Sequence, residues 1–294
     1  MVDATAAPRP ALWLVDKPEG PTSHDVVAGI RRRLGRGTKV GHTGTLDPFA
    51  TGLLVVLVGR ATRLAAYLTG LDKTYLATVR TGFASATGDP EGPVAPAGGP
   101  ATAAAVAEAL PAFTGPQVQR VPPPAAVKVD GERLYRRARR GEGVEGPERE
   151  IEIHDLRLAG DHGGGVVTLE VRCSAGTYVR RLASDLGERL GCGAYLTALR
   201  RTAVGALSVE DAVPPEEVVP GGGLDPARGV AHLPARVLGE EERGEVVHGR
   251  PIPARAGEAG AGAVALLAAD GRLVAVARPG GSGLRPAVVL EDPR

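Results

Sequence analysis

The chain has 294 residues and a formal net charge of +1, with 43% hydrophobic but only 3% aromatic residues. This length suits one larger catalytic body with a small appended module, and the apolar content is enough for a sizeable core. The near-neutral charge excludes a protein that attracts nucleic acid over its whole surface, so such a partner would have to be met by local basic patches.

Cysteine and histidine usage narrows the chemistry. Cys173 and Cys192 form no CxxC pair, and the six histidines show no metal-ligand spacing. We therefore expect no disulfide framework and no metal site. The N-terminal segment lacks the pattern of a signal peptide, and the longest apolar runs are too short for a bilayer, which predicts a soluble cytoplasmic protein without a membrane partner.

Along the chain, residues 11–23 read as a short apolar strand ending in a Pro/Gly turn. A helix should follow with Thr22 as its N-cap and Asp25 completing a capping box, and Arg31–Arg33 crowd its last turn. Cations there suit the helix dipole, so helix termination and RNA contact both remain open for the arginines.

A turn-rich segment, residues 39–52, leads into the apolar run 53–58, which predicts a strand covered on both faces. The pattern further predicts a half-buried strand, a Gly/Pro-rich loop, an alanine-rich helix, a second strand and an amphipathic helix, over residues 73–82, 84–100, 101–113, 166–173 and 177–191.

Composition changes near residues 219–229, which read as a linker, and short strands separated by turns follow. The mixed order of strands and helices predicts an α+β body rather than a doubly wound sheet. We expect a catalytic domain over residues 1–228, with a thumb-like loop at about 120–148, and a small β-rich domain over 229–294.

Asp47 is the only acid between Gly41 and Gly52. An aspartate before a proline often does no more than form an Asx turn. However, this loop leads into a buried strand and has His42 nearby, so it is also a plausible active-site loop.

Residues 173–187 offer a partner for that acid. Arg180 and Arg181 open a helix, where cations oppose the helix dipole, so each needs a reason to be there. Arg181 can pair with Asp185 at i,i+4, which leaves Arg180 to meet a carboxylate elsewhere in the fold.

Residues 121–140 carry Lys128 and five arginines against two acids, a local balance of +4, and residues 141–157 reverse the sign. This stretch is either a solvated charged hairpin or a surface that contacts RNA phosphates.

Five segments occur here in the order and spacing of the TruB-type tRNA pseudouridine synthases: GHTGTLDPFATG, KTYLATVRTG, PPP…VKVDGERLYRRAR, CSAGTYVRRLASDLG and GAYLTALRRTAVG. The chain resembles this bacterial family over residues 11–215, and residues 229–294 are more loosely similar to its C-terminal PUA-like RNA-binding module. The resemblance implies a mixed, largely antiparallel sheet core with flanking helices. One departure is Ala125 and Ala126, where the family commonly has a serine.

The resemblance also implies an isomerase that converts uridine 55 in the T-loop of tRNA to pseudouridine without a cofactor. Asp47 matches the catalytic aspartate, Arg180 should pair with it and orient its carboxylate, and Tyr75 should stack on the target base. The target uridine has to leave its stack to be reached.

Four further residues match substrate-binding positions. Tyr178 and Leu199 should line the pocket, and His42 should help to hold the extruded nucleotides. Lys17 matches a polar position in the family's first motif, although it also reads as an ordinary turn lysine.

We expect a monomer that acts on the T-stem-loop without a protein partner. Two alternatives stay open: a guide-RNA-dependent synthase of the same fold, and a tRNA-binding or folding protein without essential catalysis.

Overall fold

The computed structural model describes residues 9–122, 128–129, 132–133, 146–281 and 283–293. The chain forms two compact units: unit 1 contains Met1–Asp47, Leu53–Gly70 and Ala206–Arg294, and unit 2 contains Pro48–Gly52 and Leu71–Gly205. None of the helices formed by the described residues is long and apolar enough to cross a membrane.

From residue 9 onward, the N-terminal part of unit 1 holds three strands and short helices. They are β1 (Ala11–Lys17), α1 (Ser23–Leu34), β2 (Val40–His42), β3 (Thr51–Val58, whose first two residues belong to unit 2), η1 (Gly59–Leu64) and α2 (Ala65–Leu68). β2 pairs antiparallel with β3. Val15, Ile30 and Val56 belong to one buried core cluster, so β1, α1 and β3 share a hydrophobic core.

Helix α1 begins as its sequence predicts. Thr22 and Asp25 form a complete capping box, and the arginines occupy the last turn. Two of them also bind backbone: Arg31 donates to Val40 O at 3.0 Å and Arg33 to Pro215 O at 3.0 Å. These contacts give both side chains a structural role at the end of the helix.

The C-terminal part of unit 1 contains a separate five-stranded sheet in the order β14-β16-β17-β18-β15. Its elements are β14 (Ala235–Val237), α6 (Glu240–Val247), β15 (Ile252–Pro253), β16 (Val264–Leu267), β17 (Leu273–Gly280) and β18 (Gly283–Val289). It is preceded by β13 (Leu207–Ser208) and the short helices η3 (Val209–Asp211), η4 (Pro215–Glu217) and η5 (Pro226–Val230). This sheet confirms the β-rich C-terminal module.

Unit 2 is built on five antiparallel strands in the order β12-β4-β11-β10-β7. These are β4 (Lys73–Thr81), β7 (Gly115–Arg120), β10 (Glu148–Asp161), β11 (Val166–Cys173) and β12 (Ala194–Val204). At the β12 edge, Thr51 and Gly52 of β3 pair in parallel with Arg200 and Arg201. The mixed, largely antiparallel sheet with helices is the predicted α+β class.

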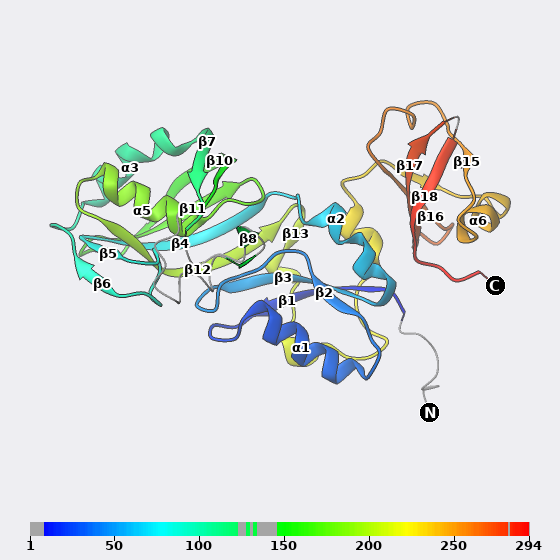
Figure 1. The fold of residues 1–294 in the computed structure, drawn as a ribbon, viewed down its shortest axis with the longest axis horizontal. Helices are drawn as coiled ribbons and strands as arrows, with labels where there is room; N and C mark the ends of the chain where they lie inside the picture. The colour runs from blue at the N-terminus through cyan, green and yellow to red at the C-terminus, as the bar shows by residue number, and fades with distance from the viewer. Residues whose placement is uncertain (1–8, 123–127, 130–131, 134–145, 282, 294) are drawn as a thin grey trace. The chain divides into compact units, whose positions relative to one another are not determined.

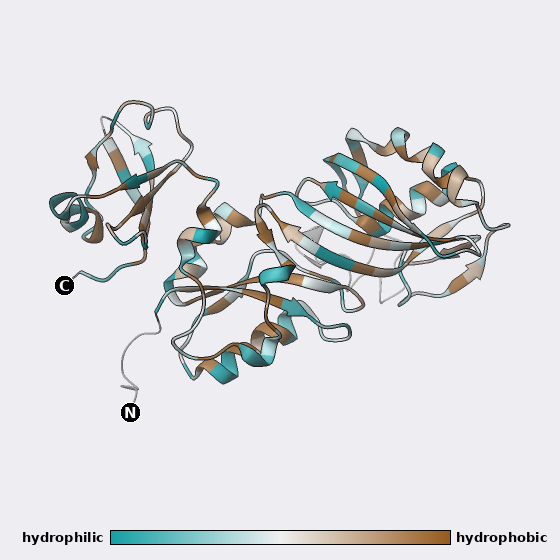
Figure 2. Ribbon diagram, turned by 180° about the vertical axis from the view of Figure 1, so that it is seen from behind, coloured by the Kyte–Doolittle hydropathy of each residue, from teal (hydrophilic) through white to brown (hydrophobic). Residues whose placement is uncertain are grey.

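Two hairpins and three helices complete the part of unit 2 that the structure describes. They are β5 (Phe83–Ser85) with β6 (Val94–Pro96), β8 (Lys128–Val129) with β9 (Glu132–Arg133), α3 (Ala103–Ala109), η2 (Leu110–Phe113) and α5 (Val179–Arg189). α5 packs against β12 and β4, and α3 packs against α5 and β10 (Figure 1). Buried and half-buried residues alternate along β4, and the strands of this sheet are correspondingly banded in Figure 2.

One segment of unit 2 differs from the prediction made from the sequence, and another lies mostly outside the described residues. The segment expected to be a loop over residues 84–100 contains the β5–β6 hairpin, because short strands among Gly and Pro leave little periodicity to detect. Most of the thumb-like segment at about 120–148 lies outside the described residues. The domain boundary at residue 228 stays a prediction.

Candidate active site

Asp47 lies half-buried in an irregular stretch between β2 and β3. The preceding residue is held by a buried serine: Ser23 Oγ accepts from Leu46 N at 2.8 Å and donates to Leu46 O at 3.0 Å. Ser23 is only 1% exposed. Helix α1 therefore fixes the backbone on the N-terminal side of Asp47, which a loop without periodicity could not do alone.

The other end of the Asp47 loop is fixed by Gly52. Its φ is +99°, and a Cβ built there would lie 2.3 Å from Arg201 O. Only glycine permits this backbone conformation together with such a close approach to β12.

Lys17 and His42 are the other predicted site residues of unit 1. Lys17 ends β1 with a fully buried side chain, and its Nζ donates to Pro18 O at 2.9 Å. This burial is incompatible with a solvated turn lysine, because a charged side chain is fully buried only when it is paired. His42 ends β2 opposite Val56 and is half-buried.

Unit 2 contains the remaining four predicted residues. Tyr75 on β4 and Leu199 on β12 are 8% and 7% exposed. Tyr178 and Arg180 stand at the start of α5, which packs against these same two strands. Arg201, which sequence reasoning did not select, lies directly opposite Tyr75 and is 2% exposed.

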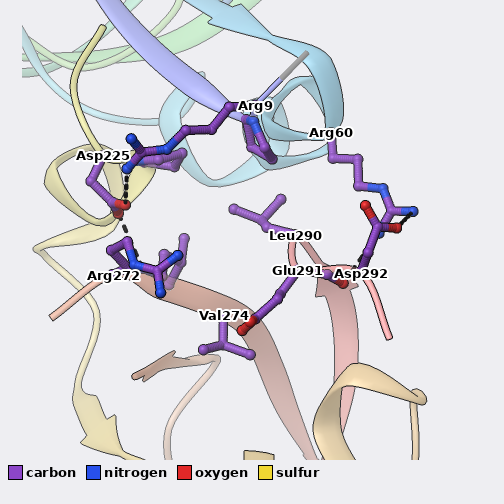
Figure 3. A pocket seen from close by; sticks show the side chains of 11 residues that line it. Arg9, Arg60, Asp225, Arg272, Val274, Leu290, Glu291 and Asp292 are labelled. Atoms are coloured by element: carbon purple, nitrogen blue, oxygen red, sulfur yellow. Dashed lines mark hydrogen bonds and ion pairs between the residues drawn. The ribbon is translucent and has the colours of Figure 1, made fainter. Parts of the chain in front are cut away.

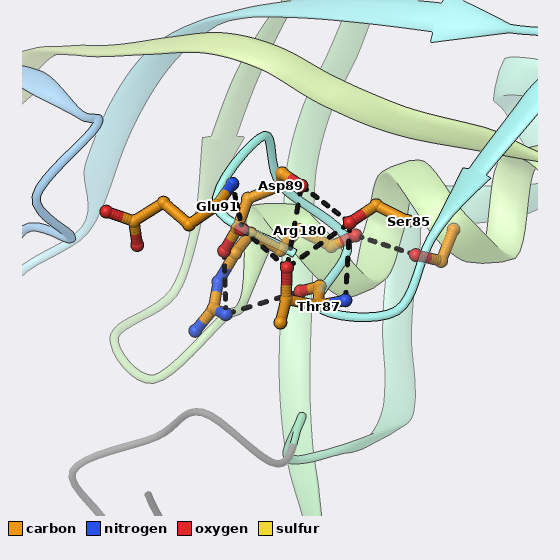
Figure 4. Close-up of polar contacts among 6 residues, drawn as sticks. Ser85, Thr87, Asp89, Glu91 and Arg180 are labelled. Carbon is orange, nitrogen blue, oxygen red and sulfur yellow. Dashed lines mark hydrogen bonds and ion pairs between the residues drawn. The ribbon is translucent and has the colours of Figure 1, made fainter. Parts of the chain in front are cut away.

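Arg180 forms a buried ion pair with Asp89, in the turn between β5 and β6 (Figure 4). Its Nη1 lies 3.1 Å from Asp89 Oδ2, and both side chains are 3% exposed. The same nitrogen donates to Thr87 O at 3.3 Å. Burial makes this pair energetically sensitive, since loss of one partner would leave a charge in the interior.

Asp89 is held in place by its own turn. Its Oδ1 accepts from Thr87 Oγ1 at 2.6 Å and from Glu91 N at 3.0 Å, while Ser85 Oγ donates to its carbonyl at 2.6 Å. Leu196 N on β12 donates to Gly88 O at 3.0 Å, which ties the turn to the sheet. The turn thus presents one oriented carboxylate oxygen to Arg180.

The neighbouring arginine behaves as predicted. Arg181 Nη2 lies 2.5 Å from Asp185 Oδ1, the expected i,i+4 ion pair on α5. The two arginines that open this helix therefore serve different partners, one on the helix surface and one in the interior.

Two buried titratable groups lie at the start of β4. Lys73 is 7% exposed, and burial, with the nearby Arg201 charge as a smaller cause, lowers its pKa from 10.5 to about 8. Cys173 is paired with Lys73 across β11 and β4, and burial raises the pKa of its thiol to about 11. The start of β4 therefore places an easily neutralised cation beside a thiol that stays protonated.

One surface pocket, of about 230 Å³, lies in unit 1 (Figure 3). Three arginines and three acids balance its charge, and none of the predicted site residues lines it; the charged lining residues are Arg9, Arg60, Arg272, Asp225, Glu291 and Asp292. In the part of the chain that the structure describes, no group of three or more His, Cys, Asp or Glu side chains is placed to hold a metal ion.

The predicted residues thus fall into two sets: Asp47, His42 and Lys17 in unit 1, and the other four in unit 2. Sequence reasoning missed Ser23 and Asp89. Asp89 stands in a Gly-Asp-Pro triplet of a Gly/Pro-rich segment, where an Asx-turn former is the default interpretation. The only signal in the sequence was that this aspartate precedes a proline, as Asp47, Asp225 and Asp292 also do.

Comparison with family models covers most of the chain. A model described as "TruB family pseudouridylate synthase (N terminal domain)" matches residues 31–179. Models described as "tRNA pseudouridylate synthase B C-terminal domain" and "tRNA Pseudouridine synthase II, C terminal" match residues 180–220 and 233–291.

Similar proteins extend over nearly the whole chain. A protein of Synechococcus sp. (strain WH7803) named tRNA pseudouridine synthase B is 45% identical, over 95% of this chain and 96% of its own. One of Thermobifida fusca (strain YX) with the same name is 46% identical, over 94% and 97%. Among solved structures, an archaeal box H/ACA sRNP Nop10-Cbf5 complex matches with a TM-score of 0.70 at 25% identity, covering 96% of this chain and 86% of the other.

Proposed function

The chain belongs to the TruB family of pseudouridylate synthases, and on this premise we propose that it isomerises uridine 55 in the T-loop of tRNA to pseudouridine. It is an isomerase of the pseudouridine synthase type. The observation that carries the tRNA substrate is the similarity, over nearly the full length, to proteins named tRNA pseudouridine synthase B.

The proposed reaction breaks the N1–C1′ bond, rotates the base and joins C5 to C1′, while the C5 proton leaves and N1 gains a proton. No atom is lost from the nucleotide apart from this exchange, so the chemistry requires no electron donor or acceptor. Asp47 starts it, either by attack on C1′ or by promoting departure of the base through a glycal. The two hydrogen bonds from Ser23 to the Leu46 backbone support this role, because they limit the positions that the Asp47 carboxylate can take.

The other predicted residues complete the proposal. Tyr75 stacks on the extruded uridine, Tyr178 and Leu199 line its pocket, and His42 and Lys17 contribute to holding the substrate strand. Extrusion costs a few kcal/mol of stacking, which contacts of this kind offset.

Arg180 is proposed to orient Asp47, and the buried Asp89 to orient Arg180. The contact of Arg180 with Asp89 Oδ2 at 3.1 Å uses only one guanidinium nitrogen, Nη1. Arginine carries five N–H donors and is able to serve two carboxylates at once. Asp89 therefore supports the proposed role of Arg180 without excluding Asp47 as a second partner.

Tritium release from tRNA labelled at uridine C5 tests the proposal, because the C5 hydrogen must leave whenever isomerisation completes. Purified protein should release about one equivalent per tRNA, and a transcript with cytidine at position 55 should release none from that site. Asp47→Asn should abolish release yet keep tRNA binding. Wild-type release by Asp47→Asn would refute its catalytic role.

A guide-dependent synthase is the second candidate, favoured only by the fold similarity to the box H/ACA complex. The proteins named tRNA pseudouridine synthase B are much closer, at 45% and 46% identity. We therefore propose a monomer that acts alone. Release that begins only after a guide RNA and partner proteins are added would favour the guide-dependent function instead.

A further inference from the structure

Gln119, on the edge strand β7, binds one residue with both ends of its side-chain amide. Its Oε1 accepts from Tyr178 N at 2.7 Å, and its Nε2 donates to Tyr178 O at 3.0 Å. The reverse orientation of the amide would place donor against donor and acceptor against acceptor, so this pairing fixes which atom is oxygen. The two residues are 59 positions apart in the sequence.

The location of Gln119 follows from strand alternation. Its neighbour Val118 is 61% exposed, whereas Gln119 is 4% exposed. A polar amide buried from an edge strand needs partners for both of its polar atoms, and the Tyr178 backbone supplies them. The burial of Gln119 is thus explained by its contact with the start of α5.

Tyr178 is the residue at which the preceding loop becomes helix. Its carbonyl accepts the first helical hydrogen bonds, from Arg181 N at 3.0 Å and Leu182 N at 3.1 Å. Its own side chain makes no capping hydrogen bond. Gln119 therefore supplies, from another strand, the bond to the N-cap N–H that the N3 side chain of a capping box provides in other helices.

Arg180 follows two residues later and meets a second constraint. A Cβ at Gly88 would lie 3.1 Å from Arg180 O, so the Asp89 turn is packed tightly against the first turn of α5. The segment from Tyr178 to Arg180 is held by Gln119 at one end and by the Asp89 turn at the other.

We infer that Gln119 is a positioning residue of the active site, which sets Tyr178 and Arg180 at their working places through the Tyr178 backbone. It does not touch substrate in this role. The inference rests on the functions proposed above for Tyr178 and Arg180.

The first experiment compares Gln119→Leu with Gln117→Leu. Gln117 lies on the same strand, and its side chain donates to Phe113 O at 2.6 Å, so it is a matched control that has a different backbone partner. Under single-turnover conditions, Gln119→Leu should release tritium about 10²-fold more slowly than wild type, because small misplacements of reacting groups are costly. The tRNA Kd of Gln119→Leu should stay within about threefold of wild type. For Gln117→Leu, both the single-turnover rate and the tRNA Kd should stay within that range.

A second variant, Gln119→Glu, gives a readout that a merely structural residue would not. A protonated glutamic acid can accept from Tyr178 N and donate to Tyr178 O, whereas the carboxylate repels that carbonyl. The single-turnover rate of Gln119→Glu relative to wild type should therefore be low at pH 8 and should increase as the pH is lowered, and the ratio for Gln119→Leu should stay flat.

The charges around residue 119 affect the pH at which the rate of Gln119→Glu changes. Arg149 lies opposite Gln119 on β10, and Arg180 and Arg181 follow Tyr178 on α5; all three favour the carboxylate form. Glu148 and Arg120 form a pair beside them on the two strands. The test therefore uses the direction of the change in rate and not its midpoint.

Tyr178→Leu and Arg180→Lys are measured in parallel. They separate the positioning role of Gln119 from the roles proposed for Tyr178 and Arg180 themselves. If both variants lose rate while Gln119→Leu keeps it, only the positioning role is wrong. A wild-type rate for Gln119→Glu at pH 8, or a rate loss matched by weaker tRNA binding, would also overturn it. If Tyr178→Leu and Arg180→Lys turn over like wild type, the proposed site is wrong and the inference falls with it.

Discussion

The hydroxyl of Ser23 makes two hydrogen bonds to the residue that precedes Asp47, and it does so from a helix whose start is itself capped. A serine at this place reads in the sequence as one more polar residue of a helix N-terminus. In the structure it is the contact that restrains the Asp47 loop.

Ser23→Ala should therefore slow single-turnover tritium release by about 10-fold or more, because the Asp47 carboxylate loses a fixed backbone. Thermal unfolding should report a loss of about 1–3 kcal/mol from the unsatisfied Leu46 N–H. Ser208→Ala is a suitable control, since Ser208 caps an exposed 3₁₀ turn through a single bond to Glu210 N. Unchanged turnover in Ser23→Ala would show that Asp47 needs no such restraint.

The buried pair of Asp89 and Arg180 has an exposed counterpart of equal length. Asp211 and Arg228 are also 3.1 Å apart, but their side chains are 50% and 53% exposed. Asp89→Asn should cost about 3–5 kcal/mol of the free energy of unfolding, because it removes the carboxylate charge that lies 3.1 Å from a buried guanidinium.

Asp211→Asn, by contrast, should cost less than about 1 kcal/mol, because solvent screens the exposed pair. Denaturant unfolding of the two variants side by side checks both values. Equal losses would mean that the Asp89 pair is not an essential part of the interior.

At the scale of secondary structure, the junction of β3 with β12 depends on one glycine. Gly52→Ala would place a methyl group 2.3 Å from Arg201 O at a φ of +99°. We expect a loss of more than about 2 kcal/mol, from backbone strain and from displacement of the β12 backbone.

Gly41→Ala is the matched control, because its added Cβ would come no closer than 3.9 Å to another atom. It should cost less than about 0.5 kcal/mol. The midpoints of urea unfolding measure the loss of stability in both variants. A Gly52→Ala protein as stable as Gly41→Ala would contradict the close approach of Gly52 to the β12 backbone.

The start of β4 predicts a pH dependence of stability. The pKa of Lys73 falls from 10.5 in the unfolded chain to about 8 in the folded protein, so between these values the unfolded state binds more protons. The free energy of unfolding therefore rises with pH through this window, and the destabilising contribution of about 3 kcal/mol is fully present below pH 8.

Cys173 acts in the opposite direction, since its thiol pKa is raised from 9.0 to about 11 and stability is lost between those values. Comparison with Lys73→Met removes most of this contribution, because Cys173 and its burial are present in both proteins. From pH 7.5 to 10.5, the free energy of unfolding of wild type should increase by about 3 kcal/mol relative to that of Lys73→Met. A pH-independent difference in stability between wild type and Lys73→Met would disprove the assignment.

For the whole molecule, the net charge of +1 makes tRNA binding dependent on local basic segments. The clearest one in the sequence is residues 121–140. Replacing Arg136, Arg137, Arg139 and Arg140 by Gln should reduce the slope of log K against log salt by up to about 3, if each residue releases counterions from a phosphate.

The control removes the same number of charges elsewhere, from exposed arginines outside residues 229–294 that pair with carboxylates: Arg9, Arg60, Arg157 and Arg228. It should leave the slope nearly unchanged. Equal slopes for both variants would favour a solvated charged hairpin over a phosphate-binding surface.

The sequence alone determined the local features of this protein, because they depend on neighbours within a few residues. The capping box of α1, the doubly covered strand at 53–58, the alternation along β4 and the pairing of Arg181 with Asp185 all follow from such short spacings. Family-specific motifs at five places further established the fold class and the type of reaction.

Only the tertiary structure decided which residues support the site. Asp89 and Arg180 are 91 positions apart, Gln119 and Tyr178 are 59 apart, and Ser23 and Leu46 are 23 apart. Asp47 and Asp89 stand in two of the four Asp-Pro dipeptides of the sequence, yet Asp89 is a buried partner of an arginine and Asp47 lies in the loop before β3. Partners at such separations are chosen by strand pairing and helix packing, which no local spacing encodes.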